Sequence, residues 1–201
     1  MAINRPPSDI TPKAFFEEWL PGEYAKLSAS AAGKAPPDAV IGVALSGDGG
    51  GAWTLAMKSG ALTGTAGAPA TADFILSHSV DDWRAVIIGE QGGPKLLPGN
   101  ANPMDALLAA DDTLKAALDP ISGTIELNVT GFNGRTWSLK IAFKGAADPA
   151  ASITVDTDTL AQMRAGTIAP PQAFFAGKIA ITGDVNFAMQ LGMAMMARMN
   201  Q

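Results

Sequence analysis

The chain has 201 residues, of which 47% are hydrophobic and 16% charged, enough apolar material for one or two packed domains and too much for a mainly disordered chain. The 14 Lys and Arg residues against 19 Asp and Glu give a net charge of −5, which argues against a nucleic-acid partner. The chain has no cysteine, which excludes disulfides, thiolate metal sites and a cysteine nucleophile. Without an apolar signal segment or membrane span in the sequence, we expect a cytoplasmic protein with no integral membrane segment.

The first predicted element is helical and runs from Thr11 to Ser28. Thr11 is a plausible N-cap, and Pro12 fits the first helical turn. Pro21 and Gly22 together predict a break into two short helices. The predicted apolar face consists of Phe15, Phe16, Trp19, Leu20 and Leu27.

Residues 39–58 predict a β-hairpin, because apolar residues alternate on both sides of a glycine-rich turn at 47–51. The turn lacks a Walker lysine and leads into a strand, so a phosphate-binding loop is disfavoured. The second face of this hairpin carries small residues, and we expect it to be covered as well. The alternating apolar residues are Ile41, Val43, Leu45, Trp53, Leu55 and Met57.

A strand over 72–76 and a helix beginning at Val80 are predicted next. His78, the only histidine, lies at the corner between them, and no Gly-x-Ser-x-Gly elbow offers it a serine to activate. We therefore interpret His78 as a surface or capping residue, and Asp81 and Asp82 as helix-capping carboxylates. The glycine- and proline-rich stretch 92–103 predicts a boundary between two halves, 1–100 and 101–201.

The second half repeats the first about 84 residues later. We predict a helix over 104–118, a hairpin around the turn Asn133-Gly134, a strand over 152–155 and a helix from Thr159. Residues 83–85 and 163–165 occupy matching places in the order of elements, within the helices that follow the third strand of each half. Glu126 and Lys140 are expected to pair across the hairpin on its solvent side. Asp156 and Asp158 are interpreted as capping residues, since they lack the glycine and distal glutamate of a calcium loop. The residues matched across the hairpins are Gly47, Gly50, Trp53 and Leu55 with Gly131, Gly134, Trp137 and Leu139.

The C-terminal segment has no clear counterpart in the first half. A short strand over 178–182 precedes Asp184, a good N-cap for a last helix over 185–199. This helix is apolar almost all round and holds five of the nine methionines. Such a helix must be covered by the sheet, by a partner protein or by a ligand, and an ordinary core helix remains an open alternative.

Residues 172–191 combine two phenylalanines, a Gly-Lys pair, a short strand, Gly-Asp and an apolar helix. This segment resembles the closing motif of sterol carrier protein type 2 domains, and the resemblance covers 123–199 well and 39–89 weakly. It implies an α+β fold with a mostly antiparallel twisted sheet and flanking helices, and the internal repeat adds the expectation of two related halves. It also implies an apolar tunnel for fatty acyl chains or sterols, with no catalytic residues, metal or cofactor. The first half lacks the Gly-Lys, strand and Gly-Asp ending.

The resemblance implies a set of ligand-lining residues by position, some of which must be core because one helix cannot point all of them at one cavity. They are Trp137, Leu139, Ile141, Met163, Phe174, Phe175, Ile181, Phe187, Met189, Leu191, Met193, Met195, Met196 and Met199. Lys178 or Arg164 could hold a ligand carboxylate.

The leading hypothesis is a non-catalytic lipid carrier whose halves pack as an internal pseudo-dimer and which has an apolar lipid and transient membrane or protein partners. The alternative is a structural or dimerisation module whose last helix is covered by a partner. An enzyme using His78, Asp81 or Asp82 is the weakest hypothesis, because no nucleophile, metal cluster or cofactor motif supports it.

Overall fold

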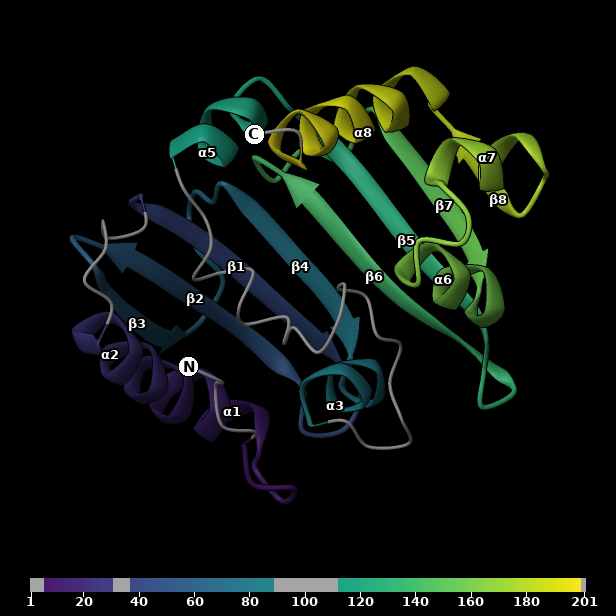
Figure 1. Ribbon diagram of the computed structural model, residues 1–201. Helices are drawn as coiled ribbons and strands as arrows, with labels where there is room; N and C mark the ends of the chain where they lie inside the picture. Colours follow the sequence, from purple (N-terminus) through teal and green to yellow (C-terminus); the bar gives the residue numbers. More distant parts are fainter. Residues whose placement is uncertain (1–5, 31–36, 89–111, 200–201) are drawn as a thin grey trace.

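A computed structural model describes residues 6–30, 37–88 and 112–199 (Figure 1). Its strands are β1 (Ala39–Ser46), β2 (Gly51–Lys58), β3 (Ala61–Ala66), β4 (Phe74–Ser79), β5 (Gly123–Phe132), β6 (Arg135–Phe143), β7 (Ala150–Asp156) and β8 (Ile179–Gly183). Its helices are α1 (Pro12–Ala14), the π-helical turn η1 (Phe15–Trp19), α2 (Leu20–Ser30), α3 (Val80–Ile87), α5 (Asp112–Leu118), α6 (Thr157–Arg164), α7 (Pro170–Phe175) and α8 (Val185–Met199). None of the helices within these ranges is long and apolar enough to cross a bilayer.

The strands form one continuous sheet in the order β3-β2-β1-β4-β6-β5-β7-β8 (Figure 1). Only the pairs β1–β4 and β5–β7 are parallel, and the other five neighbouring pairs are antiparallel. The predicted α+β fold with a mostly antiparallel sheet and flanking helices is therefore confirmed.

Most large apolar residues of the strands share one face of the sheet, and the helices pack on that face. They form a core under η1 and α2, a second under α8, and a third between α3 and α6. The opposite face carries mainly small and polar residues, with Val40 and Ile75 as apolar exceptions. Pro69 packs there against Gly42, but Ala44, Thr54 and Ala56 keep partial exposure. The predicted cover of this second face is thus only partial.

Both predicted hairpins are confirmed, with β1 paired to β2 and β5 paired to β6. Asn133 and Gly134 take φ values of 47° and 76°, the positive angles that a two-residue hairpin turn of the primed type requires. Glu126 lies opposite Lys140, as expected. The edge strand β3 was not predicted, because its residues are small and alternate weakly.

The N-terminal helix does not break at Pro21, contrary to the prediction. α2 continues through Pro21 and Gly22 to Ser30, and the irregular part is η1, one turn earlier. A proline ring in a regular helix meets the carbonyl of the residue four positions before it, here Glu17. Glu17 lies in the π-helical turn, where Leu20 N–H donates to the Phe15 carbonyl. The wider turn accommodates the proline where a break was expected.

The two halves share an order of elements and a pattern of pairing. β1 pairs antiparallel with β2 and parallel with β4, which leads into α3; β5 pairs in the same way with β6 and β7, which leads into α6. The helix caps Ser79 and Asp156 correspond, and they are 77 residues apart since 156 − 79 = 77. Trp83 therefore corresponds to Leu160, so the expected match to Met163 is wrong by one helical turn.

The halves join through β4 and β6, which are not equivalent strands. β4 corresponds to β7, and β6 corresponds to β2. Since a two-fold arrangement would pair equivalent edges, the halves are joined head to tail. In the second half β8 lies next to β7, and at the seam β6 lies in the same way next to β4, the counterpart of β7. In the first half β3 lies next to β2, and at the seam β4 lies in the same way next to β6, the counterpart of β2. Each half thus supplies the strand that the other lacks.

Candidate functional site

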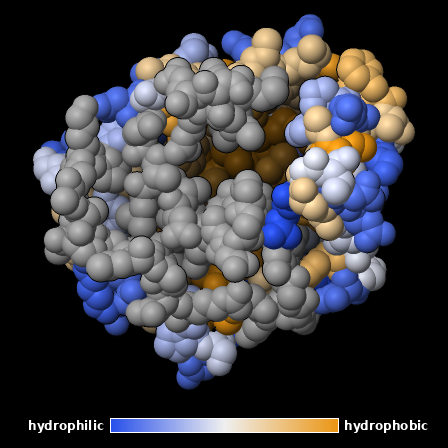
Figure 2. Space-filling view, viewed as in Figure 1, coloured by the Kyte–Doolittle hydropathy of each residue, from blue (hydrophilic) through white to orange (hydrophobic). Residues whose placement is uncertain are grey.

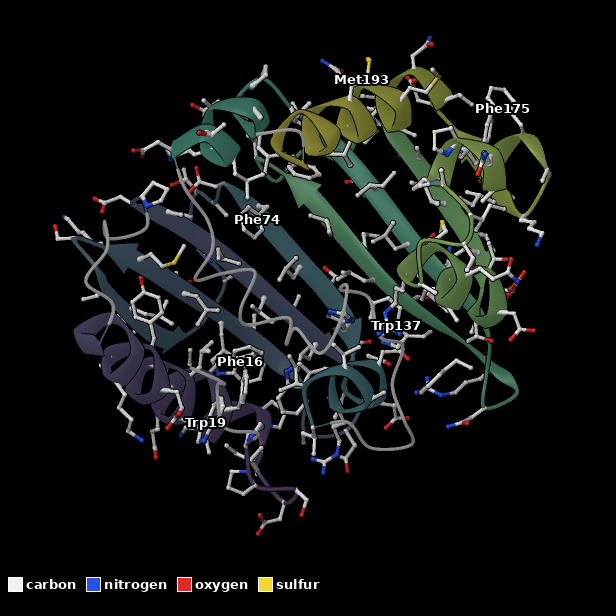
Figure 3. All side chains as sticks on the ribbon, viewed as in Figure 1. Phe16, Trp19, Phe74, Trp137, Phe175 and Met193 are labelled. Atoms are coloured by element: carbon white, nitrogen blue, oxygen red, sulfur yellow. The ribbon has the colours of Figure 1, made fainter. Side chains whose placement is uncertain are left out.

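The helix-side face of the sheet is hollowed near the seam between the halves. Figure 2 shows a deep opening there whose floor is hydrophobic. The strands at the seam are β4, β6 and β5. Some of their large apolar residues on this face, such as Ile125 and Trp137, are buried, but five others are half-buried although they contact the cores. Leu76 lies opposite Ile141, and Leu127 lies opposite Leu139. These residues and Phe74, labelled in Figure 3, form what we call the seam floor: Phe74, Leu76, Leu127, Leu139 and Ile141.

One side of α8 closes the second core beside the seam floor. Asp184 caps the helix, since its Oδ1 accepts from Phe187 N–H at 2.9 Å. The Phe187 ring packs so tightly on Gly123 that a Cβ at this glycine would stand 2.9 Å from it. Phe187, Ala188 and Leu191 are buried. The buried side of α8 is therefore a wall next to the hollow.

The other side of α8 is exposed, so the sheet covers only one side of this helix. Val185, Met189 and Met193 are 41%, 57% and 58% exposed and lie four residues apart, on one stripe of the helix. Phe174 and Phe175 in α7 are 41% and 85% exposed. Met193 and Phe175 point outward in Figure 3. We call these five residues the C-terminal apolar surface.

The predicted site residues lie in several different parts of the fold. Leu139, Ile141 and Ile181 are half-buried on the helix side of the sheet, and Phe187 and Leu191 are buried in the wall. Trp137 is 0% exposed and belongs to the third core. Met163 is half-buried on α6, whereas Phe174, Phe175, Met189 and Met193 belong to the C-terminal apolar surface. The side chains of Met195, Met196 and Met199 lie outside the described residues. Ligand contact by any of them stays a prediction.

The seam floor includes residues of the first half that the sequence did not single out. Phe74 and Leu76 lie in β4, and Phe74 contacts both the first and the second core. Their alternation in the strand before α3 was visible, but no local pattern shows that β4 pairs with β6. Leu127 was recognised as a strand residue and was not assigned to the site.

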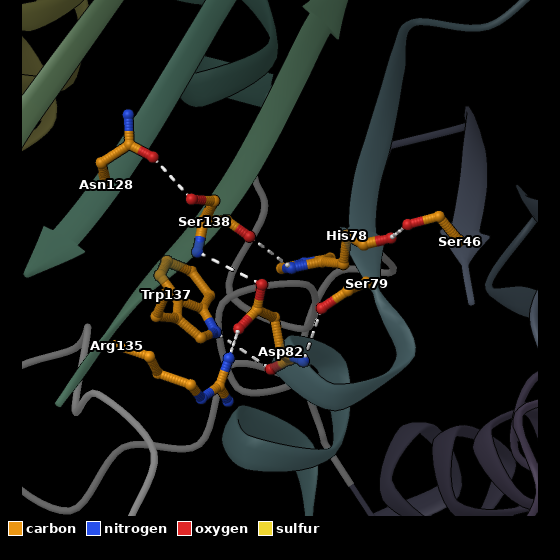
Figure 4. Close-up of polar contacts among 8 residues, drawn as sticks. All are labelled: Ser46, His78, Ser79, Asp82, Asn128, Arg135, Trp137 and Ser138. Atoms are coloured by element: carbon orange, nitrogen blue, oxygen red, sulfur yellow. Dashed lines mark hydrogen bonds and ion pairs between the residues drawn. The ribbon is translucent and has the colours of Figure 1, made fainter. Parts of the chain in front are cut away.

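A polar junction joins the halves at one end of the seam (Figure 4). Asp82 in α3 is 7% exposed, and its carboxylate forms an ion pair with Arg135 and accepts from Ser138 N–H at 3.4 Å. The indole N–H of Trp137 donates to the Asp82 carbonyl at 2.9 Å. Ser79 caps α3 by accepting from Asp82 N–H. Asp82 was expected to cap its own helix and instead binds a strand of the other half.

His78 is also placed differently from the prediction. It is half-buried in β4, 5.5 Å from the Trp137 ring, and is neither a surface residue nor a cap. Its Nδ1 lies 3.2 Å from the Ser138 carbonyl oxygen. Burial lowers the pKa of His78 below its usual 6.5, against the opposing effects of the Ser138 carbonyl and the Asp82 charge. The neutral imidazole is therefore the form present at pH 7.

This lowered pKa predicts a pH-dependent stability. Unfolded chains bind a proton on His78 near the usual pKa of 6.5, but the folded protein does so only at lower pH. Protonation thus favours the unfolded state, and the stability contribution is complete above pH 6.5 and lost as the pH falls toward the folded pKa. We expect the stability of wild type relative to His78→Gln to be constant above about pH 7.5 and to decline toward about pH 5 in urea unfolding. A difference independent of pH would contradict the assignment.

The other charged groups that were weighed as candidates form caps, ion pairs or surface contacts in the described part of the chain. Within 6–30, 37–88 and 112–199, no group of three His, Cys, Asp or Glu residues could hold a metal ion. The Asp82 carboxylate faces Arg135 and not the imidazole of His78. Asp156 is a helix cap, as predicted, and its hydrogen bond from Thr159 N–H lowers its pKa. Lys178 donates to Gln162 at 3.2 Å on the exposed side of α6.

Comparisons with known proteins agree with the resemblance seen in the sequence. The family model described as the SCP-2 sterol transfer family matches residues 104–196. A sterol carrier protein domain 2 from Helicoverpa armigera is 24% identical over 39% of this chain and 69% of its own, with a TM-score of 0.31.

Two further solved structures are similar over a comparable part of the chain. Sterol carrier protein 2 like 2 from Aedes aegypti is 20% identical over 39% of this chain and 93% of its own, with a TM-score of 0.28. Sterol carrier protein 2 from Yarrowia lipolytica is 20% identical over 46% and 77%, with a TM-score of 0.32. No curated protein matches the chain.

Proposed function

From a C-terminal half that matches the SCP-2 sterol transfer family, we propose that this chain is a non-catalytic carrier that binds an apolar lipid between the sheet and its helices. The observation that carries the proposal is the seam floor, whose five large apolar residues stay half-buried on the helix side of the sheet. Figure 2 shows a hollow with a hydrophobic floor on this side of the molecule. In a closed core such residues would be fully buried. A cytoplasmic location is part of this proposal.

The seam floor can supply the binding free energy without a charged anchor. Burying a chain of about twelve carbons contributes about 10 kcal/mol gross, at roughly 0.8 kcal/mol per methylene. Association and ordering oppose this by several kcal/mol, which leaves an affinity in the micromolar range as the expectation. A fatty acyl chain or a sterol-like body would both present the required apolar surface.

We also propose that residues 1–100 and 101–201 are related halves that build one site together. The shared order of elements and the corresponding caps Ser79 and Asp156 support a common origin. Phe74 and Leu76 come from the first half, and Leu127, Leu139 and Ile141 from the second. One site at the seam, in place of one tunnel in each half, follows from this distribution.

The C-terminal apolar surface favours a second candidate function, an interaction module in which a partner covers α7 and α8. Exposed apolar side chains gathered in one area are typical of contact surfaces. Native mass spectrometry of the freshly purified protein separates the two functions. A monomer carrying an extractable lipid supports the carrier, and a lipid-free dimer at all concentrations supports the interaction module.

Filling the hollow should abolish lipid uptake. We expect Ile141→Trp to weaken binding of a fluorescent fatty acid at least about tenfold, because the larger side chain occupies space above the seam floor. Thr65→Trp, at an exposed position on the opposite face of the sheet, is the control of matched size and should leave the affinity within about twofold. Thermal unfolding checks that both variants fold. Equal affinities of Ile141→Trp and wild type would place the lipid elsewhere.

A further inference from the structure

The face of the sheet that the helices cover is apolar in nearly every position of its eight strands. The registers place on this face alternate residues from each strand, and in the described strands only His78 and Arg135 among them are polar. Arg135 lies at the start of β6. Its guanidinium forms an ion pair with Asp82 and lies over the Phe132 ring, with Cζ 5.3 Å from the ring centroid. His78 thus ends the apolar row that Phe74 and Leu76 begin in β4.

The hydrogen bond to Ser138 determines what His78 can offer a ligand. A carbonyl oxygen only accepts, so Nδ1 must carry the hydrogen in this contact. In the neutral imidazole Nε2 is then unprotonated and only accepts. Within the described part of the chain Nε2 has no hydrogen-bond partner. It is also absent from the fully buried side-chain atoms without a partner, so Nε2 retains some exposed surface. Nε2 of His78 is thus an accessible hydrogen-bond acceptor at the end of the apolar row, and an apolar ligand with a hydrogen-bond donor at one end would match it.

We propose that His78 receives the hydroxyl group of the apolar ligand, and that the site therefore prefers an alcohol to a carboxylate or an ether. This inference rests on the proposed function and adds the class of head group. The hydrocarbon body lies on the seam floor, and its hydroxyl hydrogen points at Nε2 of His78. A carboxylate offers no hydrogen to this nitrogen at neutral pH, and an ether offers none at any pH.

The cationic groups around the site support the same choice. Arg135 is paired with Asp82, and Lys178 donates to Gln162 on the outer side of α6. The Arg135 guanidinium is thus already paired with a carboxylate of the protein. The expectation from the sequence that Lys178 or Arg164 holds a ligand carboxylate stays a prediction.

Three ligands with the same chain test this proposal: dodecanol, its methyl ether and dodecanoate. Competition against a fluorescent fatty acid at pH 7.5 should show the alcohol binding about tenfold more tightly than the ether, the effect of one hydrogen bond. His78→Leu should lose this preference and keep the affinity for the ether. His78→Gln should retain part of it, because its amide can donate to Ser138 and still accept. Thr65→Leu, an exposed position on the opposite face, is the control.

A second measurement needs no variant. The chain has one histidine, so the imidazole nitrogen NMR spectrum reports His78 alone. We expect an unprotonated Nε2 whose resonance shifts with dodecanol and not with the ether. Equal affinities for alcohol and ether, a preference that survives in His78→Leu, or a protonated Nε2 would overturn the proposal while apolar binding stands. If none of the three ligands binds, the proposed function fails as well.

Discussion

Replacing Gly64 by alanine is expected to lower the free energy of unfolding by about 3 kcal/mol, although alanine ordinarily suits a strand better than glycine does. Gly64 lies in β3, and a Cβ there would stand 1.8 Å from the Phe16 carbonyl oxygen. The obstacle is backbone, which cannot rotate aside. Seating the extra methyl group requires η1 to move off β3 and to unpack Phe16 from Trp53, whose rings are 5.1 Å apart.

Gly22→Ala is the matched control, because it makes the same chemical change in α2. No atom lies within 4 Å of the position that its Cβ would take. Alanine favours a helix interior, so we expect this variant to be more stable than wild type by up to about 1 kcal/mol. Urea unfolding followed by tryptophan fluorescence measures both. Two variants of equal stability would show that η1 is not seated on β3 as described.

Asp82→Ala is expected to cost about 3 kcal/mol of stability. The change removes the ion pair with Arg135 and the acceptor for Ser138 N–H at the junction between the halves (Figure 4). Arg135 keeps 34% of its side-chain exposure, which holds the cost below that of stranding a fully buried charge. Chemical denaturation provides the measurement.

Two further variants locate the origin of this loss. Asp81→Ala changes the exposed carboxylate next in sequence and should stay within about 0.5 kcal/mol of wild type. Combining Asp82→Ala with Arg135→Met should cost less than the sum of the single changes, because no guanidinium is left without its partner. An additive double variant would mean that the ion pair does not couple α3 to β6.

The local parts of the fold could be predicted from the sequence because they depend on neighbouring residues. Strict alternation from Ile125 to Val129 and the Asn133-Gly134 turn determine both the register of the hairpin and its inward face. Capping by Asp156 and Asp184 follows from the free N–H groups of a first helical turn. The same reasoning failed at Pro21, where a π-helical turn one step earlier relieved the clash.

The parts that could not be predicted depend on contacts between distant segments. Asp82 binds Arg135, which is 53 positions away in the sequence. From its neighbours in sequence alone, the Asp82 carboxylate was predicted to cap its own helix. The apolar composition of α8 correctly indicates a buried side at Phe187 and Leu191. It does not reveal which methionines remain exposed, because apolar residues all round the helix give no preferred direction. The seam floor could not be predicted either, because its residues come from β4 of the first half and from β5 and β6 of the second.

The seam between β4 and β6 has a consequence for expressing the protein as two fragments. Expressed alone, residues 1–100 would expose β4 as an unpaired edge strand, and residues 101–201 would expose β6. Unprotected edges of this kind recruit other strands and promote aggregation. We therefore expect separate fragments to be recovered only when they are produced in the same cell, where each can cover the exposed edge strand of the other.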